Sequence, residues 1–209
     1  DNWRGEYFNN TNLSGNPVVV RDDAGVNFDW GNSSPVPGVV NSDSFSARWS
    51  RTLNFTGGRY QITTTADDGI RVWINNQLLI DQWRDQTLST FMTEATLPGG
   101  ALPVRIEYYE RGGGAVARVQ WTPVATTINN WRGEYLTNRN LTGNPFAIRD
   151  DAAIDFGWGD GAPLSGMDRD NFSVRWTRTL NLTPGRYRFT TATDDGVRLW
   201  VNDRLIIDR

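Results

Sequence analysis

The chain has 209 residues, with 21 basic and 24 acidic side chains and a formal net charge of −3. It contains no cysteine and no histidine, which excludes disulfides, Ser-His and Cys-His catalysis, and the usual zinc sites. Its basic residues form no uninterrupted block, so the sequence predicts neither nucleic-acid binding nor membrane insertion. No apolar run reaches the roughly 20 residues of a membrane span, and no signal peptide precedes Asp1, which suggests a mature protein or an excised fragment.

The alternation of apolar and polar residues predicts several strands along the chain. Apolar and polar residues alternate in 45–50, 60–64, 70–74, 104–108 and 115–121, which is typical of half-buried strands. Glycine- and asparagine-rich turn signals separate these runs, at 57–58, 68–69, 75–76, 98–100 and 112–114. Because no helical period of useful length accompanies them, the sequence predicts an all-β fold, an antiparallel sandwich or barrel.

The second half of the chain repeats the first. The segment Asn-Trp-Arg-Gly-Glu-Tyr at 2–7 returns at 130–135, a spacing of 128, and Asp-Asp-Gly at 67–69 returns at 194–196, a spacing of 127. Such a period is the size of a whole domain. The second copy stops at Arg209, level with Gln82. We therefore predict a complete domain at 1–122, a short linker at 123–129 and an incomplete second domain at 130–209 with the same strand order.

Several ordered motifs point to a family. They are Trp-Arg-Gly-Glu-Tyr at 3–7, Ala-Asp-Asp-Gly-Ile-Arg-Val-Trp-Ile-Asn at 66–75, Leu-Ile-Asp-Gln-Trp at 79–83 and Ile-Glu-Tyr-Tyr-Glu-Arg-Gly-Gly-Gly-Ala at 106–115. In this order they resemble the protective-antigen fourteen-kilodalton (PA-fourteen) domain family, over all of 2–122 and part of 130–209. The resemblance implies a β-sandwich module of bacterial toxins, glycosidases, secreted proteins and adhesins, which is a lectin in the adhesin branch.

The resemblance also implies a calcium site. In the adhesin branch two adjacent Asp residues joined by a cis peptide and an Asn on a second loop bind the ion, which holds sugar hydroxyls. The Asp pair falls on Asp67 and Asp68, and the Asn position falls on Glu110. A pocket-shaping Trp of the adhesins falls near Gly114, so we expect a shallow site with weak affinity.

The residue chemistry is compatible with the same site, although residue types alone favour an ordinary turn. Adjacent carboxylates repel each other unless a positive group lies between them, and Ca²⁺ prefers six to eight oxygen ligands. Asp67, Asp68 and Glu110 supply carboxylates, and the loop from Gly112 to Gly114 can turn carbonyls toward an ion. The alternative is an ordinary Asp-Gly turn, with the acidic pair neutralised by an arginine: Arg71, Arg105 or Arg111. In the second copy Asp194 and Asp195 are candidate ligands without a counterpart of Glu110.

The aromatic residues divide into core and surface candidates. We expect Trp49, Trp83 and Trp121 in the core. Trp73 alternates away from its apolar neighbours, and we favour a second layer of core over a sugar-stacking role for it. Tyr109 is the candidate sugar-facing aromatic.

The most consistent interpretation is a non-catalytic, calcium-dependent carbohydrate-binding module of a secreted or cell-surface protein, with glycans as partners. The alternative is a structural spacer or filament subunit that binds neighbouring copies of itself, because unpaired strand edges of an incomplete domain can be completed by another chain. A glycosidase needs two carboxylates in a deep cleft, whereas these acids cluster in turns. The sequence therefore does not predict an enzyme.

Overall fold

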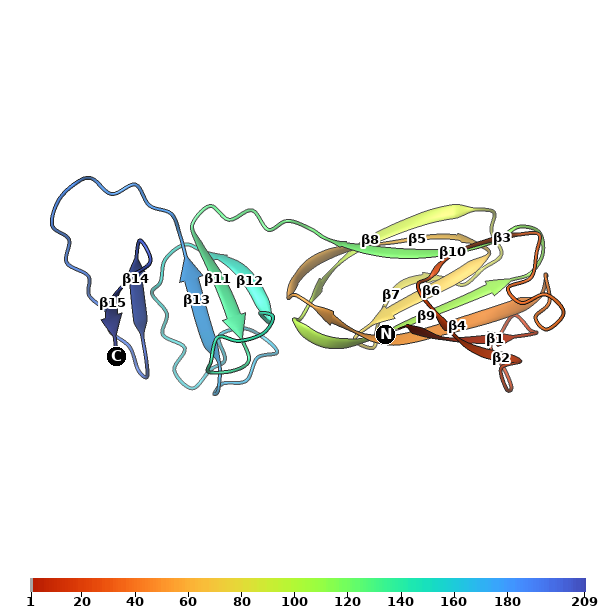
Figure 1. The fold of residues 1–209 in the computed structure, drawn as a ribbon, viewed down its shortest axis with the longest axis horizontal. Coiled ribbons are helices and arrows are strands. Elements are labelled where there is room, and N and C mark those ends of the chain that lie inside the picture. Colours follow the sequence, from red (N-terminus) through yellow and green to blue (C-terminus); the bar gives the residue numbers. More distant parts are fainter. Residues whose placement is uncertain (1) are drawn as a thin grey trace. The chain divides into compact units, whose positions relative to one another are not determined.

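The fold is entirely β. The computed structural model describes residues 2–209, which form fifteen strands and no helix (Figure 1). This confirms the all-β class. A helix of the length and apolarity that a membrane span requires is not found in residues 2–209.

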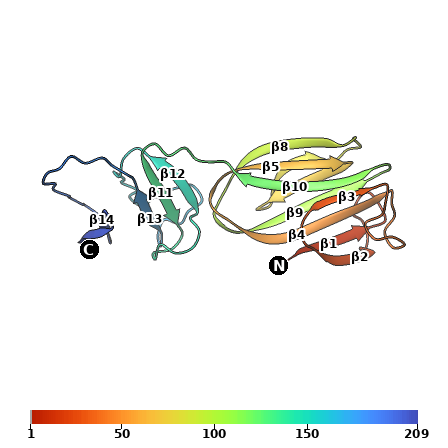
Figure 2. The same cartoon turned by 45° about the horizontal axis from the view of Figure 1, so that its top comes forward.

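The first copy is a sandwich of two antiparallel sheets (Figure 2). The larger sheet contains, in spatial order, β2 (Val19–Asp23), β1 (Trp3–Phe8), β4 (Phe45–Phe55), β9 (Gly100–Glu110), β6 (Gly69–Ile74) and β7 (Gln77–Gln82). The smaller sheet contains β3 (Asn27–Gly31), β10 (Ala115–Pro123), β5 (Gly58–Asp67) and β8 (Ser89–Leu97). The predicted strand runs all fall inside these elements.

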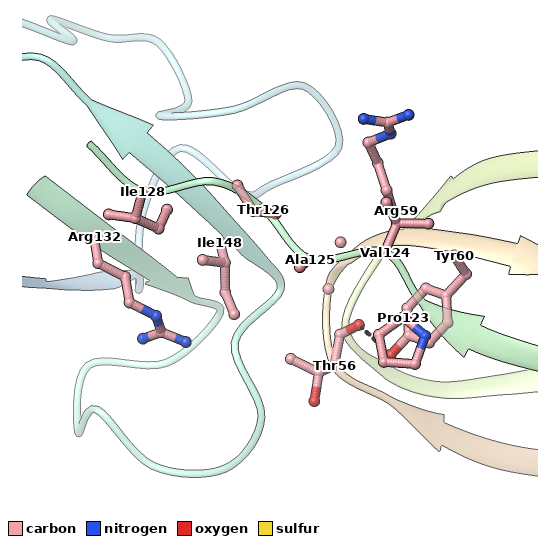
Figure 3. A pocket seen from close by; sticks show the side chains of 12 residues that line it. Thr56, Arg59, Tyr60, Pro123, Val124, Ala125, Thr126, Ile128, Arg132 and Ile148 are labelled. Carbon is pink, nitrogen blue, oxygen red and sulfur yellow. Dashed lines mark hydrogen bonds between the residues drawn. The ribbon is translucent and has the colours of Figure 1, made fainter. Parts of the chain in front are cut away.

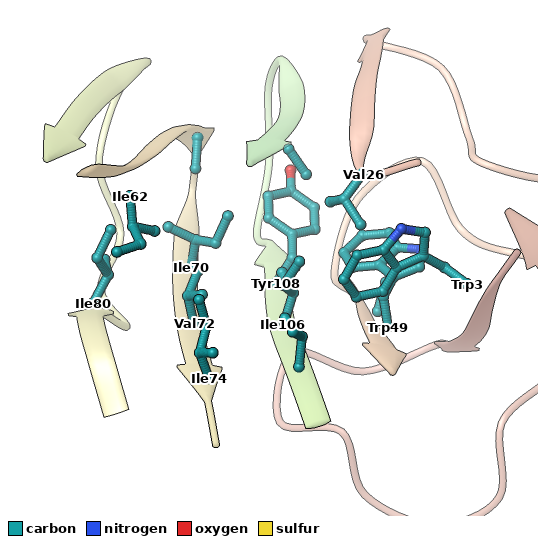
Figure 4. Close-up of a cluster of buried hydrophobic side chains, with 14 of the residues drawn as sticks. Trp3, Val26, Trp49, Ile62, Ile70, Val72, Ile74, Ile80, Ile106 and Tyr108 are labelled. Carbon is teal, nitrogen blue, oxygen red and sulfur yellow. The ribbon is translucent and has the colours of Figure 1, made fainter. Parts of the chain in front are cut away.

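The core lies between the two sheets and follows the predicted alternation. On β4, the side chains of Phe45, Ala47 and Trp49 are fully buried, and Arg48 between them is half-exposed. Figure 4 shows the apolar residues of β6 and β9 converging on the same layer, among them Ile70, Val72, Ile74, Ile106 and Tyr108. Burial of such side chains stabilises a fold by about 1.5–3 kcal/mol each.

A buried carboxylate joins three strands of this core. Asp23 is 6 % exposed and its Oδ2 accepts hydrogen bonds from the Tyr7 hydroxyl at 2.7 Å and from Trp49 Nε1 at 2.8 Å. The Arg21 guanidinium lies 2.7 Å from Asp23 Oδ1. The charge is thus paired and hydrogen-bonded, as burial requires. Asp23 therefore has a structural role.

Two tryptophans depart from the expectation of core burial. Trp73 lies outside the core cluster, and the Arg105 guanidinium lies 4.0 Å from its ring centroid. Trp83 is also outside the core; its ring meets Tyr109 edge-on with centroids 4.8 Å apart. Trp121, in contrast, packs against the core as predicted.

The second copy repeats the opening of the first. Its three-stranded sheet has the order β12 (Ala147–Asp151), β11 (Trp131–Leu136), β13 (Ser173–Thr177), matching β2, β1 and β4. The register is the same: Gly133 pairs with Trp176 as Gly5 pairs with Trp49. Tyr135, Asp151 and Trp176 repeat the buried hydrogen bonds around Asp23.

The rest of the second copy repeats the first only in part. Residues 185–194, which match β5, form no strand, and β14 (Arg198–Val201) and β15 (Arg204–Asp208) pair only with each other in a separate compact unit, Thr179–Arg209. In the first copy β5 pairs with β8 and β10, and β6 pairs with β9. The counterparts of β8, β9 and β10 are not in this sequence. The prediction of a common strand order holds for β11, β12 and β13 and for the hairpin β14–β15, whose register repeats that of β6 and β7. It is wrong at 155–159 and 185–194, the counterparts of β3 and β5, which form no strand.

Candidate functional site

The predicted acidic residues meet where the two sheets of the first copy are joined. Asp67 is the last residue of β5, in the smaller sheet, and Gly69 is the first residue of β6, in the larger one. Asp68 is the single residue between them. The register of β9 against β6 pairs Tyr109 with Gly69, which places Glu110, the last residue of β9, beside the acidic pair. One ligand oxygen from each of the three carboxylates lies within 4.8 Å of the others.

Asp68 is fixed by backbone donors. Its Oδ1 accepts a hydrogen bond from the Gln86 amide and its Oδ2 accepts one from the Arg111 amide, both at 2.9 Å. The Gln86 side-chain amide also donates to the Asp68 carbonyl at 2.9 Å. The Asp67–Asp68 peptide bond is cis. The carboxylate of Asp68 is therefore held in one orientation, with a loop from each side closing on it.

Glu110 carries an unsatisfied buried oxygen. Its side chain is fully buried, and the Tyr108 hydroxyl donates to its Oε2 at 3.1 Å. Its Oε1 has no hydrogen-bond partner among the described residues. A buried charged oxygen without a partner is costly. A cation beside this oxygen would supply the missing partner.

No arginine neutralises the three acids. The guanidinium groups of Arg71 and Arg105 pair with Glu107, and that of Arg111 pairs with Asp85. Within residues 2–209, none of the ion pairs involves Asp67, Asp68 or Glu110. The arginine-neutralised turn is therefore wrong as an account of this cluster.

Burial and mutual repulsion raise the pKa values of two of the three acids. Burial, followed by the charge of Asp68, raises the pKa of Glu110 to about 7. The same two causes, in the same order, raise the pKa of Asp67. Both carboxyl groups lose charge more readily than usual because nothing positive faces them. A divalent cation between them would reverse this preference.

The donor set fits a calcium ion. All three side chains offer carboxylate oxygens, and Ca²⁺ is bound through oxygen alone. The loop after β9 adds no side chain at Gly112, Gly113 and Gly114, and the φ angle of +104° at Gly113 turns its backbone in a way that favours glycine. The exposed backbone of this loop is free of bulky side chains on the solvent side.

A polar pocket of about 530 Å³ opens next to the cluster and is lined by nine residues, including Trp83, Asp85, Tyr109 and Arg111. Tyr109, the predicted sugar-facing aromatic, is only 6 % exposed. Its ring lies against Gly69, where an added Cβ would come within 2.1 Å of it, and its hydroxyl donates to Asp85 Oδ1 at 2.8 Å. Tyr109 thus holds the loop that contains Gln86, and presents little ring surface to a ligand.

The sequence did not reveal two contributors to this site. Gln86 acts on Asp68 through a backbone N–H and a side-chain amide, which no residue pattern signals. Asp85 holds Tyr109 and Arg111, and these hydrogen bonds lower its pKa. The only signal in the sequence was an acidic residue two positions after the Leu-Ile-Asp-Gln-Trp run.

The acidic pair of the second copy stands alone. Asp194 and Asp195 are exposed, and in the described part of the chain no further acidic residue joins them in a cluster of three. Asp195 has a φ angle of +66°, a turn conformation tolerated by Asp. The metal ligands expected here therefore remain an incomplete set.

Comparison with known proteins identifies the fold and its relatives. The family model of the PA14 domain matches residues 3–130 and, a second time, residues 129–209. The anti-sigma-I factor RsgI3 of Acetivibrio thermocellus is 30 % identical over 228 residues, covering 98 % of this chain and 35 % of that protein. The chain thus spans about a third of the length of this curated relative.

Two solved structures share the fold. An anti-sigma factor domain-containing protein from Clostridium clariflavum is 29 % identical, with a TM-score of 0.55 over 85 % of this chain and 68 % of that one. The PA14 domain of the antifreeze protein MpAFP is 14 % identical, with a TM-score of 0.50 over 74 % of this chain and 94 % of that one. At such low identity the second likeness concerns the fold alone.

Proposed function

Since the chain belongs to the PA14 domain family, whose model matches it twice, we propose that its first copy is a non-catalytic carbohydrate-binding module in which Asp67, Asp68 and Glu110 hold a calcium ion. The observation that carries the proposal is the orphaned, fully buried Glu110 Oε1. It lies within 4.8 Å of two further carboxylates that no arginine neutralises. A structural turn alone has no need of such an arrangement.

The chemistry of the site suits sugar hydroxyls. A calcium ion held by three carboxylates keeps coordination positions for neutral oxygen ligands, such as the vicinal hydroxyls of a sugar. The protein's own part is to fix the acids: Gln86 and Arg111 orient Asp68 through backbone amides, and Tyr108 orients Glu110. The neighbouring polar pocket with Trp83 at its wall offers an aromatic edge beside the ion, where carbohydrate rings commonly pack.

A catalytic role fits the geometry poorly. A glycosidase acid must reach the glycosidic oxygen and its partner carboxylate must face the sugar ring. Glu110 is fully buried and Asp68 is 6 % exposed, and both oxygens of Asp68 already accept backbone hydrogen bonds. Binding through a shared ion needs no such access, so we favour a binding module.

The setting we propose is a secreted or cell-surface protein. Calcium modules of extracellular proteins bind the ion with dissociation constants of about 10⁻⁴–10⁻³ M, and a site with only three side-chain ligands suits that range. With a shallow glycine-lined rim, single contacts with glycans are expected to be weak. Repetition of such modules can raise avidity by roughly 10²–10⁴ where geometry lets them act together.

A second candidate, a spacer or filament subunit, has one observation in its favour. In the second copy β14 and β15 pair only with each other, and the segment 185–194 has no strand partner. Such open edges can accept strands of another chain. Self-association without glycan binding would support this candidate over the lectin.

The test uses calcium, a chelator and two matched acidic pairs. A ligand that binds only the folded state stabilises it by about 2.7 kcal/mol at a hundredfold excess over its dissociation constant. We expect millimolar calcium to raise the unfolding temperature of the parent and of Asp195→Asn, and to leave Asp68→Asn and Glu110→Gln unchanged. Because Asp68 also accepts two amide hydrogen bonds, the measure is the response to calcium and not the stability of each variant.

Glycan binding is then measured on an array with and without chelator. We expect binding that disappears in chelator and in Asp67→Ala. Equal calcium responses in the parent and in Glu110→Gln would refute the metal site. Silence of the parent on the array at millimolar calcium, with the metal response intact, would refute the carbohydrate role alone.

A further inference from the structure

Two turns of the first copy hydrogen-bond to the second copy through main-chain atoms. Gly57, in the turn between β4 and β5, donates its N–H to the Pro145 carbonyl at 2.9 Å, and Gly99, between β8 and β9, donates to the Phe146 carbonyl at 2.8 Å. Pro145 and Phe146 lie just before β12. All four residues belong to the same compact unit, which ends at Arg178. The contact is thus a local one between three loops.

Only glycine permits this approach. A Cβ built on Gly57 would lie 1.7 Å from the Phe146 carbonyl oxygen, and one on Gly99 would lie 1.9 Å from the Pro145 carbonyl oxygen. The obstacle is backbone in both cases, so no side-chain rotation relieves it. The absence of side chains at Gly57 and Gly99 lets the two main chains come within hydrogen-bond distance.

The linker begins attached to the same end of the first copy. The Val124 N–H donates to the Arg59 carbonyl at 2.8 Å, which continues the pairing of β10 with β5 beyond Pro123. Figure 3 shows the cavity at this junction, about 240 Å³, with Tyr60 and Pro123 on one wall and Ile128 and Ile148 on the other. Apolar residues from both copies therefore line the space beside the hydrogen-bonded turns.

Within residues 2–209, comparison of the two copies shows that only one pair of segments forms this contact. By the spacing of 127 the residue that matches Gly57 is Pro184, next to Gly185, which matches Gly58. Proline has no N–H to donate, so the second copy lacks one of the two donors. In the first copy Pro17 and Val18 match Pro145 and Phe146, and Val18 is 44 % exposed. The donor turns of the first copy and the acceptor segment of the second form the one pair that the described residues contain.

We propose that Gly57 and Gly99 form a docking surface on the first copy whose partner is the Pro145–Phe146 segment of the second copy. The surface makes the first copy and residues 130–178 of the second a docked pair in place of two modules on a flexible tether. Pro184 prevents the second copy from offering the same surface to a further copy. This arrangement is independent of the calcium site, so its failure would leave the proposed function untouched.

The test measures the spread of distances between the copies. The chain has no cysteine, so spin labels attach only where cysteines are introduced, and we choose Met92→Cys on β8, which is 65 % exposed in the parent, and Arg139→Cys in the exposed loop after β11. Double electron–electron resonance should give a narrow distance distribution. Gly57→Ala and Gly99→Ala, made singly, should each widen it at least twofold.

The control is Gly25→Ala, since an added Cβ there meets nothing within 4 Å; its distribution should match that of the parent. Near-ultraviolet circular dichroism of the tryptophans checks that each variant keeps its folded first copy. A variant that loses this signal is replaced by Gly57→Pro, which removes the N–H as Pro184 does. A broad distribution in the parent, or one that no glycine variant in a folded protein changes, would overturn the proposal.

Discussion

Replacing Glu110 by Gln should make the calcium-free protein more stable above neutral pH. The pKa of Glu110 rises from its ordinary 4.5 to about 7 in the folded protein. Folding therefore favours the protonated carboxyl, and this contribution is fully present below pH 4.5 and is lost as the pH rises through 7. At about 1.36 kcal/mol per pH unit, the ionised side chain costs the calcium-free fold on the order of 3 kcal/mol. Gln carries no charge and avoids this cost.

Calcium should narrow the difference in stability between the two proteins. With the ion bound, the carboxylate of Glu110 faces a positive charge and its penalty disappears, whereas Gln offers a weaker ligand. The neighbouring Asp67 also has a raised pKa and Asp85 a lowered one, so the pH dependence of the parent alone mixes several groups. The difference between parent and variant at each pH isolates Glu110.

The assay is urea unfolding of parent and Glu110→Gln at pH 4 and pH 8.5, each in chelator and in millimolar calcium. In chelator we expect equal free energies of unfolding at pH 4 and an advantage of about 3 kcal/mol for the variant at pH 8.5, roughly 10 °C in melting temperature for a domain of this size. In calcium at pH 8.5 the advantage of the variant should shrink by about 0.4–1.4 kcal/mol, the stabilisation that a ligand at roughly one to ten times its dissociation constant gives the folded state. A variant that is no more stable than the parent at pH 8.5 in chelator would refute the view of Glu110 as a buried, uncompensated charge.

Two further predictions concern the frame around the site. Gly5→Ala should lower the free energy of unfolding by about 2–4 kcal/mol, because its Cβ would lie 2.2 Å from Asp23 Oδ2. Urea unfolding should show no comparable loss of stability for Gly25→Ala. Equal losses in the two variants would contradict the close packing at Asp23. In hydrogen exchange, the amides of 58–67 should be protected, and those of the matching segment 185–194 should exchange as in an unfolded chain. The reason is that only 58–67 has strand partners. Similar protection of the two segments would show that 185–194 also pairs with a strand.

The sequence predicted most of the fold because burial follows a period of two along a strand. Trp49 and Ile70 are in the core for that reason. The alternation also placed Trp73 on the outer face, but it could not show that Arg105 covers the ring. The expected core position of Trp83 failed because this residue follows β7, where the strand pattern no longer fixes the direction of a side chain.

The sequence predicted the three acidic residues of the site but not the groups that hold them in place. Asp67 and Asp68 stand out in the sequence because adjacent carboxylates repel each other unless a positive group lies between them. Glu110 was predicted from the family resemblance. The hydrogen bonds from the amides of Gln86 and Arg111 depend on how two loops close on Asp68. Every residue but proline has such an N–H, so its use leaves no mark in the sequence.

One strand links the completeness of the fold to the completeness of the site. β9 lies between β4 and β6 in the larger sheet, and it ends at Glu110. The same strand therefore joins the β6–β7 hairpin to the sheet and brings the third carboxylate to Asp67 and Asp68. In the second copy no counterpart of β9 is present in this sequence. There the hairpin β14–β15 pairs with nothing else, and the acidic pair lacks its third member. In the first copy, β9 thus completes both the pairing of β6 and the cluster of three acids.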